Sequence, residues 1–156
     1  MRKLLTSAIL ALAVASVAAL GADNTLGTWK LDVAKSKYTP GPLPIRSLTV
    51  TREASEGGVK QTASGERSDG TAIQAAYTAK YDGKDVQVTG NSQYDTIAIK
   101  QVNANTVTDE RKKSGGPYKA TGRTVISNGG KTMTTTTKGT NADGKEFTQT
   151  LILAKQ

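Results

Sequence analysis

Hydrophobic and polar residues alternate in short runs along most of the chain, and a turn signal follows each run. In the run 71–81, every second residue from Ile73 to Tyr81 is apolar. This spacing places the apolar side chains on one face of a β-strand, and no segment after residue 22 has the period of a helix. The pattern therefore predicts an all-β fold.

The runs follow one another closely enough to form a meander. Asp-Gly and Asn-Gly pairs recur between them, and such pairs supply the positive φ angles of two-residue hairpin loops. We expect an up-and-down antiparallel meander of about ten strands closed into a barrel, because closure removes exposed strand edges. A flattened sandwich filled with side chains is the alternative. The predicted strands are Leu26–Leu31, Ile45–Glu53, Gly58–Ser64, Thr71–Tyr81, Asp85–Thr89, Thr96–Val102, Thr106–Lys113, Tyr118–Ser127, Lys131–Thr140 and Lys145–Lys155.

One segment interrupts the series. Residues 32–44 contain Pro40, Pro42 and Pro44, which fix φ and withhold backbone donors from a sheet. We expect a loop or a short helical turn there, followed by an extended connector.

The predicted interior is thinly lined. The run 58–64 offers only Val59 and Ala63 as apolar residues, and such gaps leave room for water or a ligand inside a barrel. The residues expected to point inward are Trp29, Leu48, Val50, Ile73, Ala75, Tyr77, Ala79, Tyr81, Val86, Val88, Ile97, Ile99, Phe147, Leu151 and Leu153.

The first 22 residues have the pattern of a secretory signal peptide. Arg2 and Lys3 precede an apolar run from Leu4 to Leu20, and small residues follow it. We predict a signal peptide at 1–22, cleaved after one of residues 19–22, and a single β-barrel domain at 23–156. The protein is then periplasmic or secreted, without stable membrane insertion after cleavage; an uncleaved anchor is the alternative.

The composition removes most catalytic chemistry. The chain has no Cys and no His, which excludes disulfides, thiolate nucleophiles, imidazole bases and the usual zinc sites. Asp109 and Glu110 are adjacent on a predicted strand and so point to opposite faces, where they cannot act on one substrate together. We therefore expect a non-enzymatic protein with no catalytic residue, no metal and no cofactor.

The formal net charge of +8 is scattered along the chain. Arg111-Lys112-Lys113 is the only run of basic residues, and we interpret it as part of a solvated strand rather than as a nucleic-acid site. A weak attraction to anionic surfaces of the cell envelope is the other interpretation.

Gly27-Thr28-Trp29 on the first predicted strand resembles the Gly-x-Trp motif of the calycin superfamily, which includes the lipocalins and fatty-acid-binding proteins. The stretch from Trp29 to Pro42 is also similar to small exported bacterial proteins described as lipocalin-like. The resemblance implies that Trp29 closes one end of the barrel against a basic residue from a late strand, for which Arg123 is the candidate. The last strand, 147–153, lacks the Arg-x-Tyr that holds a carboxylate in cytosolic fatty-acid-binding proteins.

These observations lead to one functional hypothesis and one alternative. We expect a small, largely apolar ligand inside the barrel, with Trp29, Tyr77, Tyr81 and Arg123 contributing to its site. The alternative is a structural or interaction module of the cell envelope with a basic outer face and no ligand cavity.

Overall fold

The structure is a computed structural model that describes residues 21–91 and 93–156. Strands dominate these residues, and the single helical element is the short 3₁₀ turn η1 (Val33–Lys35). The predicted signal peptide lies outside the described residues except for Gly21 and Ala22. The strands are β1 (Gly27–Leu31), β2 (Lys37–Thr39), β3 (Ile45–Ser55), β4 (Gly58–Arg67), β5 (Ala72–Lys80), β6 (Val86–Gln87), β7 (Thr96–Asn103), β8 (Thr106–Lys112), β9 (Lys119–Ser127), β10 (Thr132–Thr140) and β11 (Glu146–Lys155).

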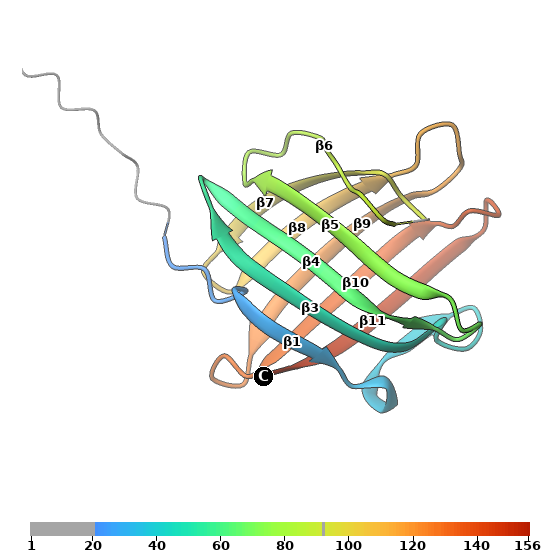
Figure 1. Ribbon diagram of the computed structural model, residues 1–156, viewed down its shortest axis with the longest axis horizontal. Helices are drawn as coiled ribbons and strands as arrows, with labels where there is room; N and C mark the ends of the chain where they lie inside the picture. Colours follow the sequence, from blue (N-terminus) through green and yellow to red (C-terminus); the bar gives the residue numbers. More distant parts are fainter. Residues whose placement is uncertain (1–20, 92) are drawn as a thin grey trace, which may run out of the picture.

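The strands form one antiparallel sheet that curls into a nearly closed barrel (Figure 1). The order is β5-β4-β3-β1-β11-β10-β9-β8-β7-β6, and β2 pairs with the early part of β11. β1 bonds to β3 on one side and to β11 on the other. It therefore joins the β3–β4 hairpin near the start of the chain to the β10–β11 hairpin at its end. The predicted up-and-down meander barrel is confirmed.

The seam of the barrel lies between β5 and β6. Two backbone hydrogen bonds close the seam among the described residues, both between Ala76 of β5 and Thr89, which lies two residues beyond the end of β6, at 3.0 and 2.9 Å. Just beyond the end of β5, the Gly83 amide donates to the Ile99 carbonyl of β7 at 2.9 Å. The ladders elsewhere run for up to ten residue pairs, so the seam is the most weakly bonded junction of the barrel.

Turn chemistry sets the hairpins. Gly70, with φ of +85°, follows Asp69, whose carboxylate accepts the Thr71 amide at 2.9 Å. Positive φ is strained for residues with a Cβ, so glycine allows the tight reversal between β4 and β5. The segment 32–44 contains the short helical turn that was expected, η1, followed by β2 and a Pro-rich connector.

Alternation divides the side chains between the interior and the solvent. The buried residues form two clusters, one around Trp29 and Leu153 and the other around Val59, Ile99 and Phe147. Most predicted inward residues are buried or line the interior, while Tyr81 and Val86 are only partly buried at the rim of the second cluster.

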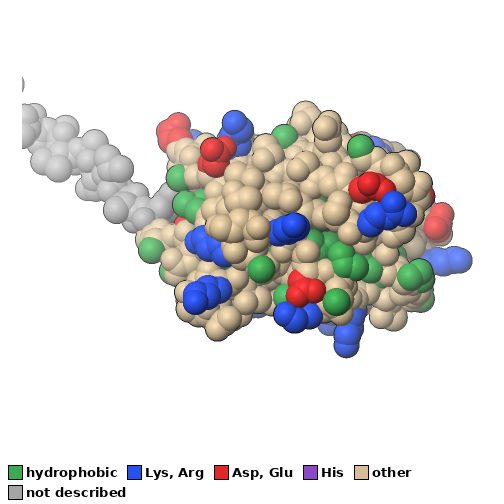
Figure 2. Space-filling view, turned by 60° about the horizontal axis from the view of Figure 1, so that its bottom comes forward, with side chains coloured by type: hydrophobic (Ala, Val, Ile, Leu, Met, Phe, Trp, Pro, Cys, Tyr) green, Lys and Arg blue, Asp and Glu red, His purple; other side chains and the backbone are tan. Residues whose placement is uncertain are grey.

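The outer surface carries dispersed charge. On the face in Figure 2, basic and acidic side chains are scattered and hydrophobic side chains form only small groups. Within the described part of the chain, no helix is long and apolar enough to span a bilayer.

Candidate ligand pocket

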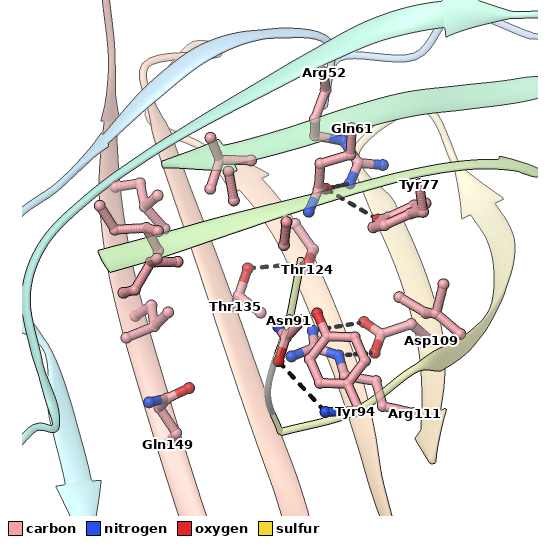
Figure 3. Close-up of a pocket in the computed structure, with 18 of the residues that line it drawn as sticks. Arg52, Gln61, Tyr77, Asn91, Tyr94, Asp109, Arg111, Thr124, Thr135 and Gln149 are labelled. Carbon is pink, nitrogen blue, oxygen red and sulfur yellow. Dashed lines mark hydrogen bonds and ion pairs between the residues drawn. The ribbon is translucent and has the colours of Figure 1, made fainter. Parts of the chain in front are cut away.

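A pocket of about 130 Å³ lies inside the barrel between β3–β5 and β7–β11 (Figure 3). One side of it is apolar, because alternate residues of β3, β5, β10 and β11 point inward there. The side chains of this wall include Leu48, Val50, Ile73, Met133, Leu151 and Leu153. Figure 3 shows the polar side chains mainly on the other side, so the pocket has two chemically different walls.

The first polar group surrounds Arg52 of β3, whose side chain is almost fully buried. Its Nη1 donates to Gln61 Oε1, which also accepts the Tyr77 hydroxyl at 3.0 Å. Its Nε donates to Thr25 Oγ1 at 3.1 Å, and its Nη2 donates to the Tyr81 hydroxyl at 3.4 Å. Every one of these partners is neutral.

The charge of Arg52 is therefore balanced only at a distance. Among the described residues no carboxylate lies within ion-pair distance of Arg52; the Asp23 carboxylate instead accepts the hydroxyl of Tyr81. Burial alone would lower the pKa of Arg52, but Tyr77, Tyr81 and Asp23 raise it. Arg52 stays charged, so the pocket wall carries a cation without an ion-pair partner.

Burial also keeps Tyr77 neutral. It raises the pKa of this phenol to about 12, although the nearby Arg52 charge opposes the shift. Tyr77 therefore acts as a hydrogen-bond donor at neutral pH, and its body lines the pocket as predicted.

The second polar group is an ion pair on β8. Arg111 Nε donates to Asp109 Oδ1 at 2.6 Å, and Nη2 donates to Oδ2 at 3.2 Å. The pair points inward because residues two apart share a face of a strand. Burial would lower the pKa of Arg111, but the Asp109 carboxylate together with Tyr94 and Tyr118 raises that pKa well above its ordinary value.

A glycine on the neighbouring strand makes room for this pair. Gly122 of β9 is opposite Asp109, and a Cβ built at residue 122 would lie 2.2 Å from Asp109 Oδ2. Any side chain at this position would displace the carboxylate from Arg111.

Aromatic rings continue from the ion pair towards the end of the barrel near β2. The Arg111 guanidinium lies 5.4 Å from the centre of the Tyr94 ring, and Tyr94 stacks on Tyr118 at 5.8 Å. Phe147 follows at 6.0 Å from Tyr118 and stacks on Tyr38 at 5.7 Å. Because these rings pack on one another, they hold Arg111 in one orientation.

Between the two polar groups the pocket offers hydroxyl and amide groups. Thr124 and Thr135 share a hydrogen bond of 3.0 Å, and Gln149 projects separately in Figure 3. All buried side-chain nitrogen and oxygen atoms of the described residues have a hydrogen-bond partner. No set of three metal-ligating side chains gathers within residues 21–91 and 93–156.

Trp29 is fully buried and lies next to the pocket, packed against residues that form its apolar wall. Its indole N–H donates to the Thr25 carbonyl at 2.9 Å. Lys155, opposite Trp29 in the β1–β11 ladder, places its ammonium 5.2 Å from the ring centre.

The prediction for Arg123 was wrong. Arg123 is exposed on the outer face of β9, while its neighbour Thr124 points into the pocket, so the basic partner of Trp29 is Lys155. Tyr81 does not line the pocket either; it is half buried, and its hydroxyl accepts a hydrogen bond from Arg52 Nη2. Burial, and then the hydrogen bond to Asp23, raise the pKa of Tyr81.

The polar side chains inside the barrel were not predicted from the sequence. Arg111 was interpreted as part of a solvated strand, and Asp109 was placed only on the face opposite to Glu110. Val107 lies two residues before Asp109 on the same face, so its apolar side chain indicates that this face points inward. Arg52 follows Leu48 and Val50 at the same spacing, so alternation also predicts its inward position.

No protein-family model matches the chain, and no curated protein matches its sequence.

Proposed function

We propose that the barrel binds one small, largely apolar molecule that carries a polar or anionic group, and that it does so without catalysis. The observation that supports this most directly is the interior pocket, whose apolar wall faces the unpaired cation Arg52. An apolar body would be stabilised by removal of its surface from water, and the polar group would be held by donors already in place.

The charges of the two polar groups favour an anionic end. Within these two groups Arg52 and Arg111 carry two positive charges and Asp109 one negative charge, and Arg67 is a third cation of the pocket lining. A ligand with a carboxylate would offset the remaining charge in a region of low dielectric, where such interactions are strong.

The volume restricts the ligand to a compact molecule. Pockets for drug-sized ligands occupy roughly 300–1,000 Å³, and this one measures about 130 Å³. A ring or short chain with one polar group fits the available space without rearrangement of the walls.

The cellular setting is part of the same proposal. The apolar segment 4–20 would act as a signal peptide, which places the barrel in the periplasm or outside the cell. The Gly-x-Trp motif and the meander barrel support membership of the calycin superfamily, whose barrels enclose ligands in this way.

Binding can be tested with a panel of compact apolar carboxylates and their matching alcohols. Thermal stability and Trp29 fluorescence are measured, because Trp29 packs beside the pocket. A ligand at one hundred times its Kd should stabilise the protein by about 2.7 kcal/mol. Native mass spectrometry of protein purified gently from its host would identify a retained ligand.

Two variants on β5 provide the matched comparison. Ala75→Leu fills the pocket and should weaken binding about tenfold or more, whereas Ala72→Leu, exposed on the same strand, should leave binding unchanged. If no panel member alters the melting temperature or the fluorescence, and no ligand is retained, the proposal fails.

A further inference from the structure

A second hollow, of about 630 Å³, lies on the outer face of the barrel over β7–β10. Its side chains belong to the same strands as the polar half of the pocket but have the opposite parity: Glu110 and Arg123 point outward where Asp109 and Thr124 point inward. We call this hollow the outer groove. Among the described residues, Asp109 is the only one that lines both the outer groove and the ligand pocket.

The strand register arranges the cations of the outer groove on neighbouring strands. Lys100, Thr108, Arg123 and Thr136 form one row across β7, β8, β9 and β10. Adjacent strands lie about 4.8 Å apart, so the Lys100 and Arg123 backbones are separated by about 10 Å. Lys138, two residues after Thr136, belongs to the next row, beside Thr121.

The outer groove carries more positive than negative charge. Lys100, Arg123 and Lys138 make no ion pair with any described residue. Of the two carboxylates among the lining residues, Asp109 is paired with Arg111, and Glu110 points outward. Lys112, next along β8, is by contrast neutralised by Asp85 at 3.2 Å.

One cation is held in place by a glycine. A Cβ built at Gly83 would lie 2.4 Å from Lys100 Cε, so the lysine stem occupies the space that a side chain would fill. The contact limits the freedom of the stem and directs Lys100 along the edge of the outer groove, which lowers the entropy lost when its ammonium binds an anion.

The lining is suited to a hydrated polymer rather than to a protein surface. Ala98 is the one hydrophobic residue among the described residues that line it, whereas tight protein interfaces rely on large, desolvated aromatic or aliphatic anchors. Thr108, Thr121 and Thr136 instead present hydroxyls that both donate and accept hydrogen bonds, as sugar hydroxyls do.

We propose that the outer groove binds an acidic polysaccharide, whose carboxylates pair with Lys100, Arg123 and Lys138 while its hydroxyls bond to the threonines. Attraction between a polyanion and these cations is electrostatic, so binding weakens as salt is added. It does not require an occupied pocket.

The test uses polygalacturonate as the probe, with titration calorimetry at several salt concentrations. The triple variant Lys100→Gln, Arg123→Gln, Lys138→Gln should bind at least about tenfold more weakly and show a shallower salt dependence, because three charge pairs are lost. The matched control Lys60→Gln, Lys80→Gln, Lys131→Gln removes the same charge from exposed sites elsewhere and should stay within about twofold of the parent.

Several outcomes would overturn the proposal. An equal loss in both triple variants means attraction to net charge alone, and absence of binding to polygalacturonate excludes this polymer class. Tighter binding to polyglutamate would identify an acidic peptide as the partner instead. Melting curves of the variants establish that the fold is intact, since all six substituted side chains are exposed.

Discussion

Arg52 and Trp29 show how single residues connect the pocket to the start of the barrel. Thr25 accepts the Arg52 Nε–H at its hydroxyl and the Trp29 indole N–H at its carbonyl. Its side chain is fully buried, and Asp23 accepts both its amide and its hydroxyl. A short segment before β1 therefore satisfies two buried donors that the strands themselves leave without partners.

The contact of Lys155 with Trp29 leads to a prediction at the residue scale. Lys155→Met removes the cation above the indole ring and should destabilise the protein by about 0.5–1 kcal/mol while shifting the Trp29 emission. Arg123→Met removes the same charge from the outer face of β9 and should change neither property. Urea unfolding followed by fluorescence measures both; an effect of Arg123→Met equal to that of Lys155→Met would contradict the assignment.

The error for Arg123 has a physical cause. Around it, inward Ala120, Gly122 and Thr124 are as small or polar as their outward neighbours, so hydrophobicity does not reveal which face is buried. The inward position of Trp29 could be predicted because Trp29 and Leu31, two residues apart, are large apolar side chains on the same face of β1, and that face is buried. The buried charges could not be predicted from hydrophobicity, because burial of Asp109 depends on its ion pair with Arg111 and on the space at Gly122.

At the scale of elements, hairpin pairing explains why the strands could be predicted. Each long strand is bounded by a turn signal and pairs with a neighbour in sequence, so local information defines it. β2 was missed because it exists through pairing with β11, far along the chain, and β6 is shorter than expected because only Val86 and Gln87 pair with β7.

The weak seam gives a prediction for backbone exchange. Within the described chain, β5 is held at the seam by the bonds between Ala76 and Thr89, just beyond β6, so opening there breaks few interactions. The Thr89 amide should exchange with deuterium well before amides in the middle of β10, which is bonded to strands on both sides. Hydrogen exchange with site resolution measures this, and equal protection at the two places would show that the seam does not open separately.

At the scale of the whole molecule, the interior contains charged side chains and also tyrosines whose phenols lose their protons only at high pH. Burial raises the pKa values of Tyr77 and Tyr118 to about 12, although nearby Arg52 and Arg111 respectively oppose the shifts. The barrel therefore holds two phenolic protons more tightly than the unfolded chain does, where such groups ionise near pH 10.

This difference predicts the alkaline limit of the fold. The folded pKa values exceed the unfolded ones, so the contribution is complete below about pH 10 and is lost as the pH rises towards 12. Two pKa units correspond to on the order of 3 kcal/mol for each tyrosine. Unfolding by urea at pH 9–12 should show this decline, and Tyr77→Phe with Tyr118→Phe should flatten it. An unchanged slope in the double variant would contradict the prediction.

The position of β1 between β3 and β11 has a consequence for the order of folding. Hairpins such as β3–β4 and β9–β10 can form from neighbouring residues, but Lys30 must find Ala154 near the opposite end of the sequence. Loop closure of that length makes the contact slow and late. Trp29 can pair with Val50 of β3 early, but it is fully enclosed only after β11 is available, so its full burial should come late in folding.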